Sequence, residues 1–447
     1  TKTVQGFAEQ LSHAGIPSLV LDIKGDFSGI AKPGVRNAII EERYGKTKLD
    51  WNAQGFPVEL MTISGEEGVK LRSTVTEFGP VLLSKVLQLN ETQSGIMSIV
   101  FKYCDDKGLP LIDLKDLKKV LQYVTDNPQG KIDMTQNYGS VSTASLGAIL
   151  RSIVSLEQQG GTGFFGEPSF DVYDLKGQKD GKGVINILRV GNIQTQPQLF
   201  STFMLALFAE IYMEFPEEGD SGKPKLVLFI DEAHLIFKEA SKTLLSQIEM
   251  MVKLIRSKGV GIYFITQIPG DVPENILSQL GLKIQHALRG FTAKDKREIN
   301  KAVENYPETE YYNAGNLIQN LGIGEAFVTA LSEKGIPTPL VHTYLISPES
   351  RMDILSESEV SELASQSALV AKYKNDIDKD SAYEMLVTRM EQAVQSASAQ
   401  QKVKTVKKEQ SVVEQVLTSR AGRTFTNTLM REGAKAIMGM LGLSRRR

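Results

Sequence analysis

The hydrophobic positions of this chain form short runs that alternate with longer stretches of helical periodicity. The clearest runs are SLVLDI (18–23), GVINILRV (183–190), KLVLFI (225–230) and GIYFIT (261–266). Runs of this length and character are typical of strands that are buried on both faces. Helical periodicity over residues 198–214 and 242–258 separates the later runs. Strands that alternate with helices predict an α/β fold with a parallel, doubly wound sheet.

A long internal stretch has helical periodicity throughout. Between residues 72 and 159, apolar side chains recur every three or four positions, as in Leu114, Leu117, Val120, Leu121 and Val124. This spacing places the side chains on one helix face, so we predict an all-helical insertion in the α/β core. A further helix is expected over residues 1–14, and shorter strands are expected near residues 57–63, 283–288 and 325–330.

Composition sets limits on this picture. The chain has 447 residues, of which 41% are hydrophobic and 23% charged, as in an ordinary globular protein with a sizeable core. No run of ~18 consecutive apolar residues is present, so no transmembrane helix is predicted. Cys104 is the only cysteine, which excludes an internal disulfide and a zinc site built from several cysteines. A reducing, cytoplasmic setting is therefore expected.

Charge is distributed unevenly along the chain. Residues 401–447 hold eleven Lys/Arg against three Asp/Glu, a net charge of +8, so the remainder carries about −10 of the total of −2. A body with this balance would have to bind nucleic acid through local loops, because its surface is not basic overall.

The segment with the most specific chemistry is KLVLFIDEAH, residues 225–234. A predicted buried strand runs here into two adjacent carboxylates, Asp231 and Glu232. Ligands bind at the carboxyl ends of strands in open α/β sheets, so this pattern has the form of a Walker B motif. Asp231 would hold Mg²⁺, and Glu232 would take a proton from, or orient, the water that attacks a γ-phosphate. The alternative is a strand that ends in an acidic helix cap.

Two other predicted strands end in polar candidates. Gln267 follows GIYFIT, where its amide could donate and accept hydrogen bonds beside the attacking water. Asp22 and Asp26, in the segment DIKGD, would face the same nucleotide edge of the sheet. The alternatives are an ordinary strand-end glutamine and an ordinary Asp-Gly turn.

Together these features resemble the HerA–FtsK superfamily of P-loop ATPases, and more closely its HerA-like members of the bacterial YjgR type. The resemblance implies a P-loop NTPase fold of the RecA-like (ASCE) kind, with ATP and Mg²⁺ as cofactors. It also implies a homo-oligomeric ring, a hexamer, that acts on DNA, and it leaves open a nuclease or another protein partner. It spans residues 1–345 and reaches the arginine-terminated tail, and it is carried by the segments LVLDIKGDFSG, LNETQSGI, NYGSVSTASLGAIL, GFFGEP, GKGVINIL, PKLVLFIDEAHLIF, LIRSKGVGIYFITQ and HALRGFTAKD.

By the same resemblance, the chain starts just after a phosphate-binding loop. The family's first strand and Walker A loop end in Gly-Lys-Thr before such a helix, so Thr1 would bind the nucleotide and Mg²⁺ through its hydroxyl. Lys2–Thr3 is an alternative frame. Because the first strand and loop are missing, we expect little or no ATP hydrolysis from these 447 residues alone.

Two arginines are candidates for completing the site of a neighbouring subunit in a ring, where an arginine offsets transition-state charge. The resemblance suggests Arg256, at the end of the helix before GIYFIT, and Arg289 is the second candidate. The alternative for Arg256 is a solvated arginine that stabilises the helix end through the helix dipole.

The expected organisation follows from these assignments. Residues 1–57 and 183–348 would form the ATPase core, 58–182 a mainly helical insertion, 349–400 a polar helical segment, and 401–447 a basic linker with an amphipathic tail. The expected function is an ATP-dependent DNA helicase or translocase. The alternatives are an ATPase that acts on a non-DNA partner, in secretion or remodelling, and a non-catalytic assembly subunit.

Overall fold

The chain folds into two compact units. The computed structural model describes residues 1–63, 65–190, 197–219, 222–239, 242–304, 306–307, 309–375 and 381–392. One unit combines Thr1–Ser73 with Gln158–Ile377, and the other combines Thr74–Glu157 with the chain from Asp378 onward. The predicted basic linker and amphipathic tail, residues 401–447, lie outside the described residues, as does the end of the predicted polar segment.

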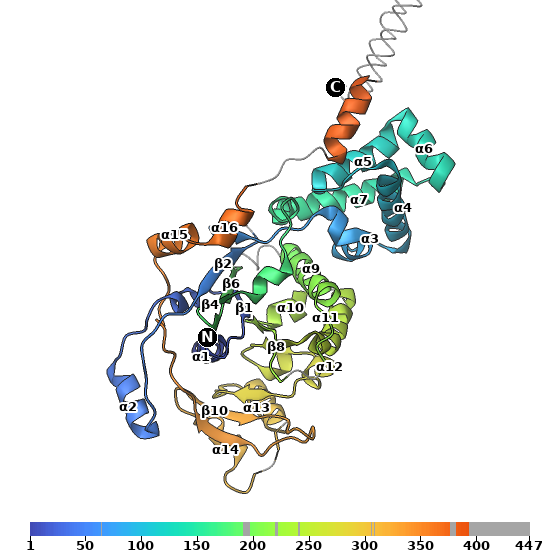
Figure 1. Cartoon of the computed structure of the whole chain (residues 1–447). Coiled ribbons are helices and arrows are strands. Elements are labelled where there is room, and N and C mark those ends of the chain that lie inside the picture. Colours follow the sequence, from blue (N-terminus) through green and yellow to red (C-terminus); the bar gives the residue numbers. More distant parts are fainter. Residues whose placement is uncertain are drawn as a thin grey trace, which may run out of the picture. The chain divides into compact units, whose positions relative to one another are not determined.

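A six-stranded parallel sheet forms the centre of the first unit (Figure 1). Its strands, in spatial order, are β3 (Val69–Lys70), β2 (Val58–Thr62), β6 (Ile185–Arg189), β1 (Ser18–Asp22), β7 (Leu226–Ile230) and β8 (Val260–Phe264). Every pairing between these strands is parallel. The α/β fold with a parallel sheet that the sequence predicted is thereby confirmed.

The middle strands of this sheet are apolar because both of their faces are covered. Every residue of β1 and β7 is buried, as expected for strands between two helical layers. Ser18 pairs with Val227 on one side and Ile185 on the other. This register brings the carboxyl ends of β1 and β7 together, where Asp22 and Asp231 lie.

Smaller sheets and helices complete the first unit. β9 (Lys283–Gln285), β10 (Glu325–Thr329) and β11 (Val341–Tyr344) form an antiparallel sheet, and β4 (Gln178–Lys179) pairs with β5 (Lys182–Gly183). The helices and short helical turns are α1 (Lys2–His13), η1 (Ser28–Ala31), α2 (Ala38–Thr47), η2 (Glu157–Gly161), α8 (Thr162–Phe164), η3 (Val172–Lys176), α9 (Pro197–Glu214), α10 (His234–Glu239), α11 (Lys242–Leu254), η4 (Ile255–Lys258), η5 (Pro269–Asp271), α12 (Glu274–Leu277), α13 (Ala293–Glu304), α14 (Ala314–Leu317), α15 (Glu357–Ser365) and α16 (Ala368–Tyr373).

Helix α1 is buried on two sides. Its apolar side, including Val4 and Ala8, packs in the core of the sheet. Its polar side is covered by a distant segment of the chain: both carboxylate oxygens of Glu9 accept hydrogen bonds, from the backbone N–H of Glu349 at 2.8 Å and of Ser350 at 3.2 Å. The segment around residue 350 is therefore fixed across the helix that precedes β1.

The second unit is helical in its described part. It contains α3 (Val75–Val86), α4 (Glu91–Lys107), α5 (Leu114–Asp126), α6 (Pro128–Tyr138), α7 (Thr143–Leu156) and a helix over residues 382–392. The apolar stripe predicted for α5 is buried along its whole length. Cys104, on α4, is also buried, and burial raises the pKa of its thiol to about 12.

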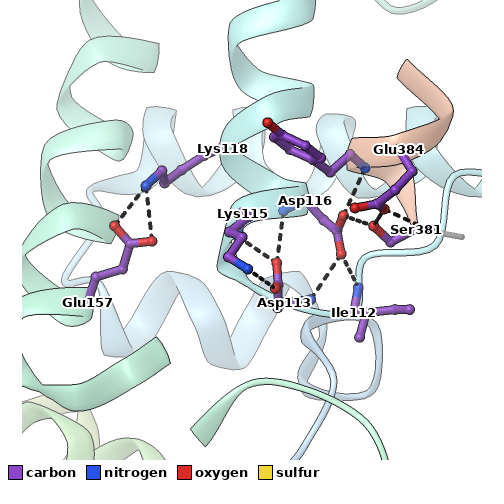
Figure 2. Close-up of polar contacts among 9 residues, drawn as sticks. Ile112, Asp113, Lys115, Asp116, Lys118, Glu157, Ser381 and Glu384 are labelled. Carbon is purple, nitrogen blue, oxygen red and sulfur yellow. Dashed lines mark hydrogen bonds and ion pairs between the residues drawn. The ribbon is translucent and has the colours of Figure 1, made fainter. Parts of the chain in front are cut away.

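A single carboxylate joins two helix ends in this unit (Figure 2). Asp116 is 1% exposed, and its Oδ2 accepts hydrogen bonds from the backbone N–H of Ile112 at 2.8 Å and of Asp113 at 3.0 Å. Its Oδ1 accepts from the backbone N–H of Tyr383 at 2.8 Å and from the Ser381 hydroxyl. Asp116 thus fixes the residues that lead into α5 and the start of the helix at 382–392 together.

In the part of the chain that the structure describes, no single helix has the length and apolarity needed to cross a membrane. One pair, Pro128–Tyr138 with Thr143–Phe164, meets the length and composition requirement jointly but is bent by 108°.

Candidate active site

The carboxyl edge of the parallel sheet gathers most of the polar candidates. Strand β7 ends at Ile230, so Asp231 and Glu232 follow at this edge, and they are 5% and 6% exposed. Strand β8 is the parallel neighbour of β7 and ends three residues before Gln267. The structure therefore brings Asp231, Glu232 and Gln267 to one edge, as the resemblance implied.

Asp231 has an oxygen with no protein partner. Its Oδ2 is buried, and no described group forms a hydrogen bond with it. Burial raises the pKa of Asp231, although the backbone N–H of Glu232 opposes the shift. Thr1, at the amino end of α1, lies near this carboxylate. A buried carboxylate oxygen without a partner is one that a cation would satisfy.

These groups fit Mg²⁺ held in the usual manner of nucleotide sites. The described residues contain no group of three or more His, Cys, Asp or Glu side chains that could form a complete metal site. Mg²⁺ commonly takes only one or two protein ligands and completes its shell with phosphates and water. The Asp231 carboxylate fits such a site, and so does Thr1, whose side chain makes no capping hydrogen bond to α1.

Glu232 is the most highly connected side chain at this edge. One of its oxygens forms an ion pair with the Lys24 ammonium. Gln267 Nε2 donates to both oxygens at 3.3 Å, and His234 Nδ1 lies 3.1 Å from Oε2. Burial alone would raise the pKa of Glu232, but Lys24 and Gln267 outweigh it, and the pKa lies below its ordinary value. Glu232 is thus ionised at neutral pH, as a proton acceptor must be.

Lys24 was not among the site residues predicted from the sequence. It follows Asp22 by two positions in the turn after β1, and β1 pairs directly with β7. A lysine just beyond the carboxyl end of a strand next to the Walker B strand was the available signal. Its partner could not be identified from sequence, because Lys24 and Glu232 meet only through the pairing of β1 with β7.

The Asp22 carboxylate is used by its own turn. Asp22 is 1% exposed, and it accepts hydrogen bonds from the backbone N–H of Gly25 at 2.8 Å, Asp26 at 3.1 Å and Phe27 at 3.0 Å. Burial raises its pKa, and these hydrogen bonds oppose the rise. Asp22 therefore shapes the turn that carries Lys24. Asp26 is half-buried in that turn and interacts electrostatically with Lys2.

Arg256, one of the two predicted arginines, lies apart from this cluster. Arg256 is exposed on η4, before the amino end of β8, whereas Gln267 follows the carboxyl end of the same strand. A five-residue strand spans about 17 Å, so Arg256 does not reach the Glu232 of its own chain. Arg289 is exposed beyond β9.

The chain is similar in sequence to one known family. The sequence pattern of a family described as "Helicase HerA-like C-terminal" matches residues 1–446. No curated protein matches the chain.

Several solved structures are similar in fold. An unbound form of the bacterial conjugative coupling protein TrwB has a TM-score of 0.50 at 13% identity, over 79% of this chain and 86% of TrwB. TrwB with a non-hydrolysable ATP analogue has a TM-score of 0.50 at 12% identity, over 79% of this chain and 84% of that one. VirB4 of Thermoanaerobacter pseudethanolicus has a TM-score of 0.41 at 14% identity, over 76% and 85%. The TrwB structures show a shared fold.

Proposed function

The chain belongs to the family of HerA-like helicase C-terminal proteins, within the HerA–FtsK superfamily of P-loop ATPases, and from this premise we propose that it is an ATP-driven motor that moves along DNA. The observation that carries the proposal is the set of Asp231, Glu232 and Gln267 at one edge of the parallel sheet. These groups have the chemistry that nucleotide hydrolysis requires, since phosphoryl transfer depends on positioning and charge stabilisation.

Each residue has a distinct role in this proposal. Asp231 and Thr1 would hold Mg²⁺, which when bound offsets the negative charge of the phosphates. Glu232, ionised and buried, accepts the proton of the attacking water. Gln267 orients that water from the neighbouring strand. Asp22 contributes by fixing the turn after β1.

We further propose that the motor is a ring, with six copies as the expected number. Arg256 is exposed and cannot reach its own Glu232, which suits an arginine that acts on a neighbouring subunit. Arg289 remains the second candidate. Mixing the Arg256→Ala and Glu232→Gln variants tests this arrangement: each alone should be inactive, and mixed rings should regain part of the ATPase activity. Mixtures as inactive as their components would oppose a shared site.

The central experiment measures ATP hydrolysis by the full-length protein with and without DNA. We expect DNA to stimulate turnover, and the stimulation to fall steeply as salt rises, because phosphate contacts release counterions. Glu232→Gln should abolish turnover, whereas the matched control Glu362→Gln, on exposed α15, should leave it unchanged. A full-length protein that stays monomeric with DNA and ATP would oppose the ring motor.

A second candidate is an ATPase that acts on a protein partner. Its supporting observation is the net charge of about −10 on residues 1–400, which does not favour a nucleic-acid surface. This candidate would be supported by ATP hydrolysis that requires Glu232 and whose rate does not change when DNA is added. An absence of hydrolysis in the full-length protein would instead support a non-catalytic assembly subunit.

A further inference from the structure

Lys24 is held at the site by a rigid turn. The Asp22 carboxylate fixes the turn by accepting three backbone N–H groups, from Gly25, Asp26 and Phe27. The Lys24 side chain extends from this turn, is 49% exposed, and ends at the Glu232 carboxylate. The backbone is thus fixed while the long side chain keeps the freedom to move its ammonium between nearby anions.

The ion pair engages the carboxylate that the proposed chemistry needs. Lys24 and Gln267 contact Oε1 of Glu232, and Gln267 and His234 lie against Oε2. Both oxygens therefore have cationic or N–H neighbours. A carboxylate held in this way is fixed in orientation, because turning it toward a water molecule would break the ion pair with Lys24.

A bound nucleoside triphosphate would offer Lys24 a second anion. The Lys24 ammonium lies close enough to interact electrostatically with Asp231, and Thr1 is nearby. These are the residues assigned to the metal and the phosphates. A γ-phosphate placed there carries more charge than one carboxylate, and a lysine ammonium binds it as a compact point charge.

We propose that Lys24 is a positioning residue that exchanges between two anions: it holds Glu232 while the site is free of nucleotide, and it moves to the γ-phosphate when a triphosphate binds, which releases Glu232 toward the attacking water. The inference rests on the proposed ATPase function. It couples the arrival of the γ-phosphate to the activation of the base, and a diphosphate, which lacks that group, leaves the Lys24–Glu232 pair intact.

The exchange predicts a particular pattern of nucleotide affinities. A nucleotide can shift Lys24 away from Glu232 only if it binds more tightly to the protein in which Lys24 is released than to the protein in which the pair is formed. Breaking the Lys24–Glu232 pair opposes triphosphate binding. Removing the carboxylate charge should therefore strengthen binding of a triphosphate but not of a diphosphate. This gain should require Lys24.

The test measures the Kd of a non-hydrolysable ATP analogue and of ADP for the full-length protein and for three variants: Glu232→Gln, Lys24→Met and the double variant. We expect Glu232→Gln to bind the analogue on the order of tenfold more tightly. Lys24→Met should lose most of the preference for analogue over ADP, and adding Glu232→Gln to it should change nothing further. The ADP affinity should be similar in all four proteins.

Two controls define the interpretation. Lys32→Met removes an exposed lysine that pairs with Glu362 instead, and it should leave both affinities unchanged. Lys24→Arg retains the charge and should retain the coupling to Glu232. Lys24→Gln, which removes the charge but keeps a polar side chain, replaces Lys24→Met in the test if that variant does not fold.

The outcomes separate this inference from the proposed function. If the wild-type full-length protein hydrolyses no ATP, the proposed function is wrong, and if Glu232→Gln still hydrolyses ATP, the role assigned to Glu232 is wrong. The exchange is overturned, and the ATPase assignment stands, if Glu232→Gln is inactive but binds the analogue no more tightly than the wild type. The same conclusion holds if Glu232→Gln raises the affinity for the analogue equally in the presence and absence of Lys24.

Discussion

Among single residues, Glu232 has the most constrained backbone at the sheet edge. Its φ of 49° lies in the left-handed region, which a non-glycine residue rarely adopts. Such a conformation costs roughly 1–3 kcal/mol and persists where the surroundings impose it, often at functional sites. Here the bend directs the Glu232 side chain to Lys24 and Gln267 as soon as β7 ends.

Gln267→Ala should separate water positioning from nucleotide binding. Gln267 is exposed and contacts Glu232, so its removal should lower kcat by about tenfold to a hundredfold with little change in KM. Steady-state ATP hydrolysis by the full-length protein measures both. Gln319→Ala, at another exposed glutamine, should leave both constants unchanged. A raised KM with normal kcat would instead assign Gln267 to ground-state nucleotide binding.

The sequence indicated part of this cluster for a clear physical reason. Asp231, Glu232 and Gln267 each follow an apolar strand, and parallel strands present their carboxyl ends together. The Asp22 side chain was harder to predict, because its role depends on the backbone of its own turn. Lys24 follows a strand end, but its contact with Glu232 could not be predicted without the pairing of β1 and β7.

Among the elements, α15 begins with a network of charged hydrogen bonds. Ser356 caps the helix, and the Glu359 carboxylate accepts a hydrogen bond from the Ser356 N–H at 2.9 Å. The Arg351 guanidinium donates to both Glu359 oxygens, at 3.0 and 2.7 Å. These contacts, Arg351 foremost, lower the pKa of Glu359 to about 2.

This network predicts how the first unit responds to acid. Because the pKa of Glu359 is lower in the folded state than its ordinary value of 4.5, its contribution to stability is present above pH 4.5. That contribution is lost as pH falls toward 2. The difference in thermal midpoint between wild type and Glu359→Gln should therefore shrink between pH 5 and pH 3, as calorimetry can measure.

Glu362→Gln is the matched control on the same helix, since Glu362 has only a long ion pair of 3.5 Å with Lys32. Its difference from wild type should be small at every pH. A difference for Glu359→Gln that stays constant down to pH 3 would contradict the assigned role.

Only part of the environment of helix α1 could be predicted from the sequence. Its existence and its apolar side were predictable from periodicity. The burial of Gln5, Glu9 and Ser12 was not, because their polarity suggests a solvent-facing side. These three side chains are buried because they form hydrogen bonds with residues 183 and 349–351. A local sequence pattern cannot predict contacts between residues so far apart in the chain.

Across the whole molecule, the two units have separate interiors. The alternation of strands and helices predicted the first, and continuous helical periodicity predicted the helices of the second. The sequence could not show that residues 381–392 belong with the helical unit, because their hydrogen bonds to the Asp116 carboxylate and to the Pro110 carbonyl join residues far apart in the chain.

Asp116→Ala should destabilise the second unit selectively. The substitution leaves three partly buried N–H donors without this acceptor, which should reduce the free energy of unfolding by about 3 kcal/mol. Hydrogen exchange by mass spectrometry should show faster exchange in α5 and in residues 382–392, with β1 and β7 unchanged. Asp126→Ala, at the exposed end of the same helix, is the control and should be neutral. Equal acceleration in both units would mean that they unfold together.

The buried thiol on α4 gives this protein a built-in chemical reporter. Cys104 is the chain's only cysteine, and its raised pKa keeps it protonated and unreactive while the second unit is closed. The rate of its modification by a thiol reagent therefore measures how often that unit opens. A cysteine introduced elsewhere can carry a fluorophore in the native protein without first replacing others, so conformational changes around Glu232 can be followed in an otherwise unaltered chain.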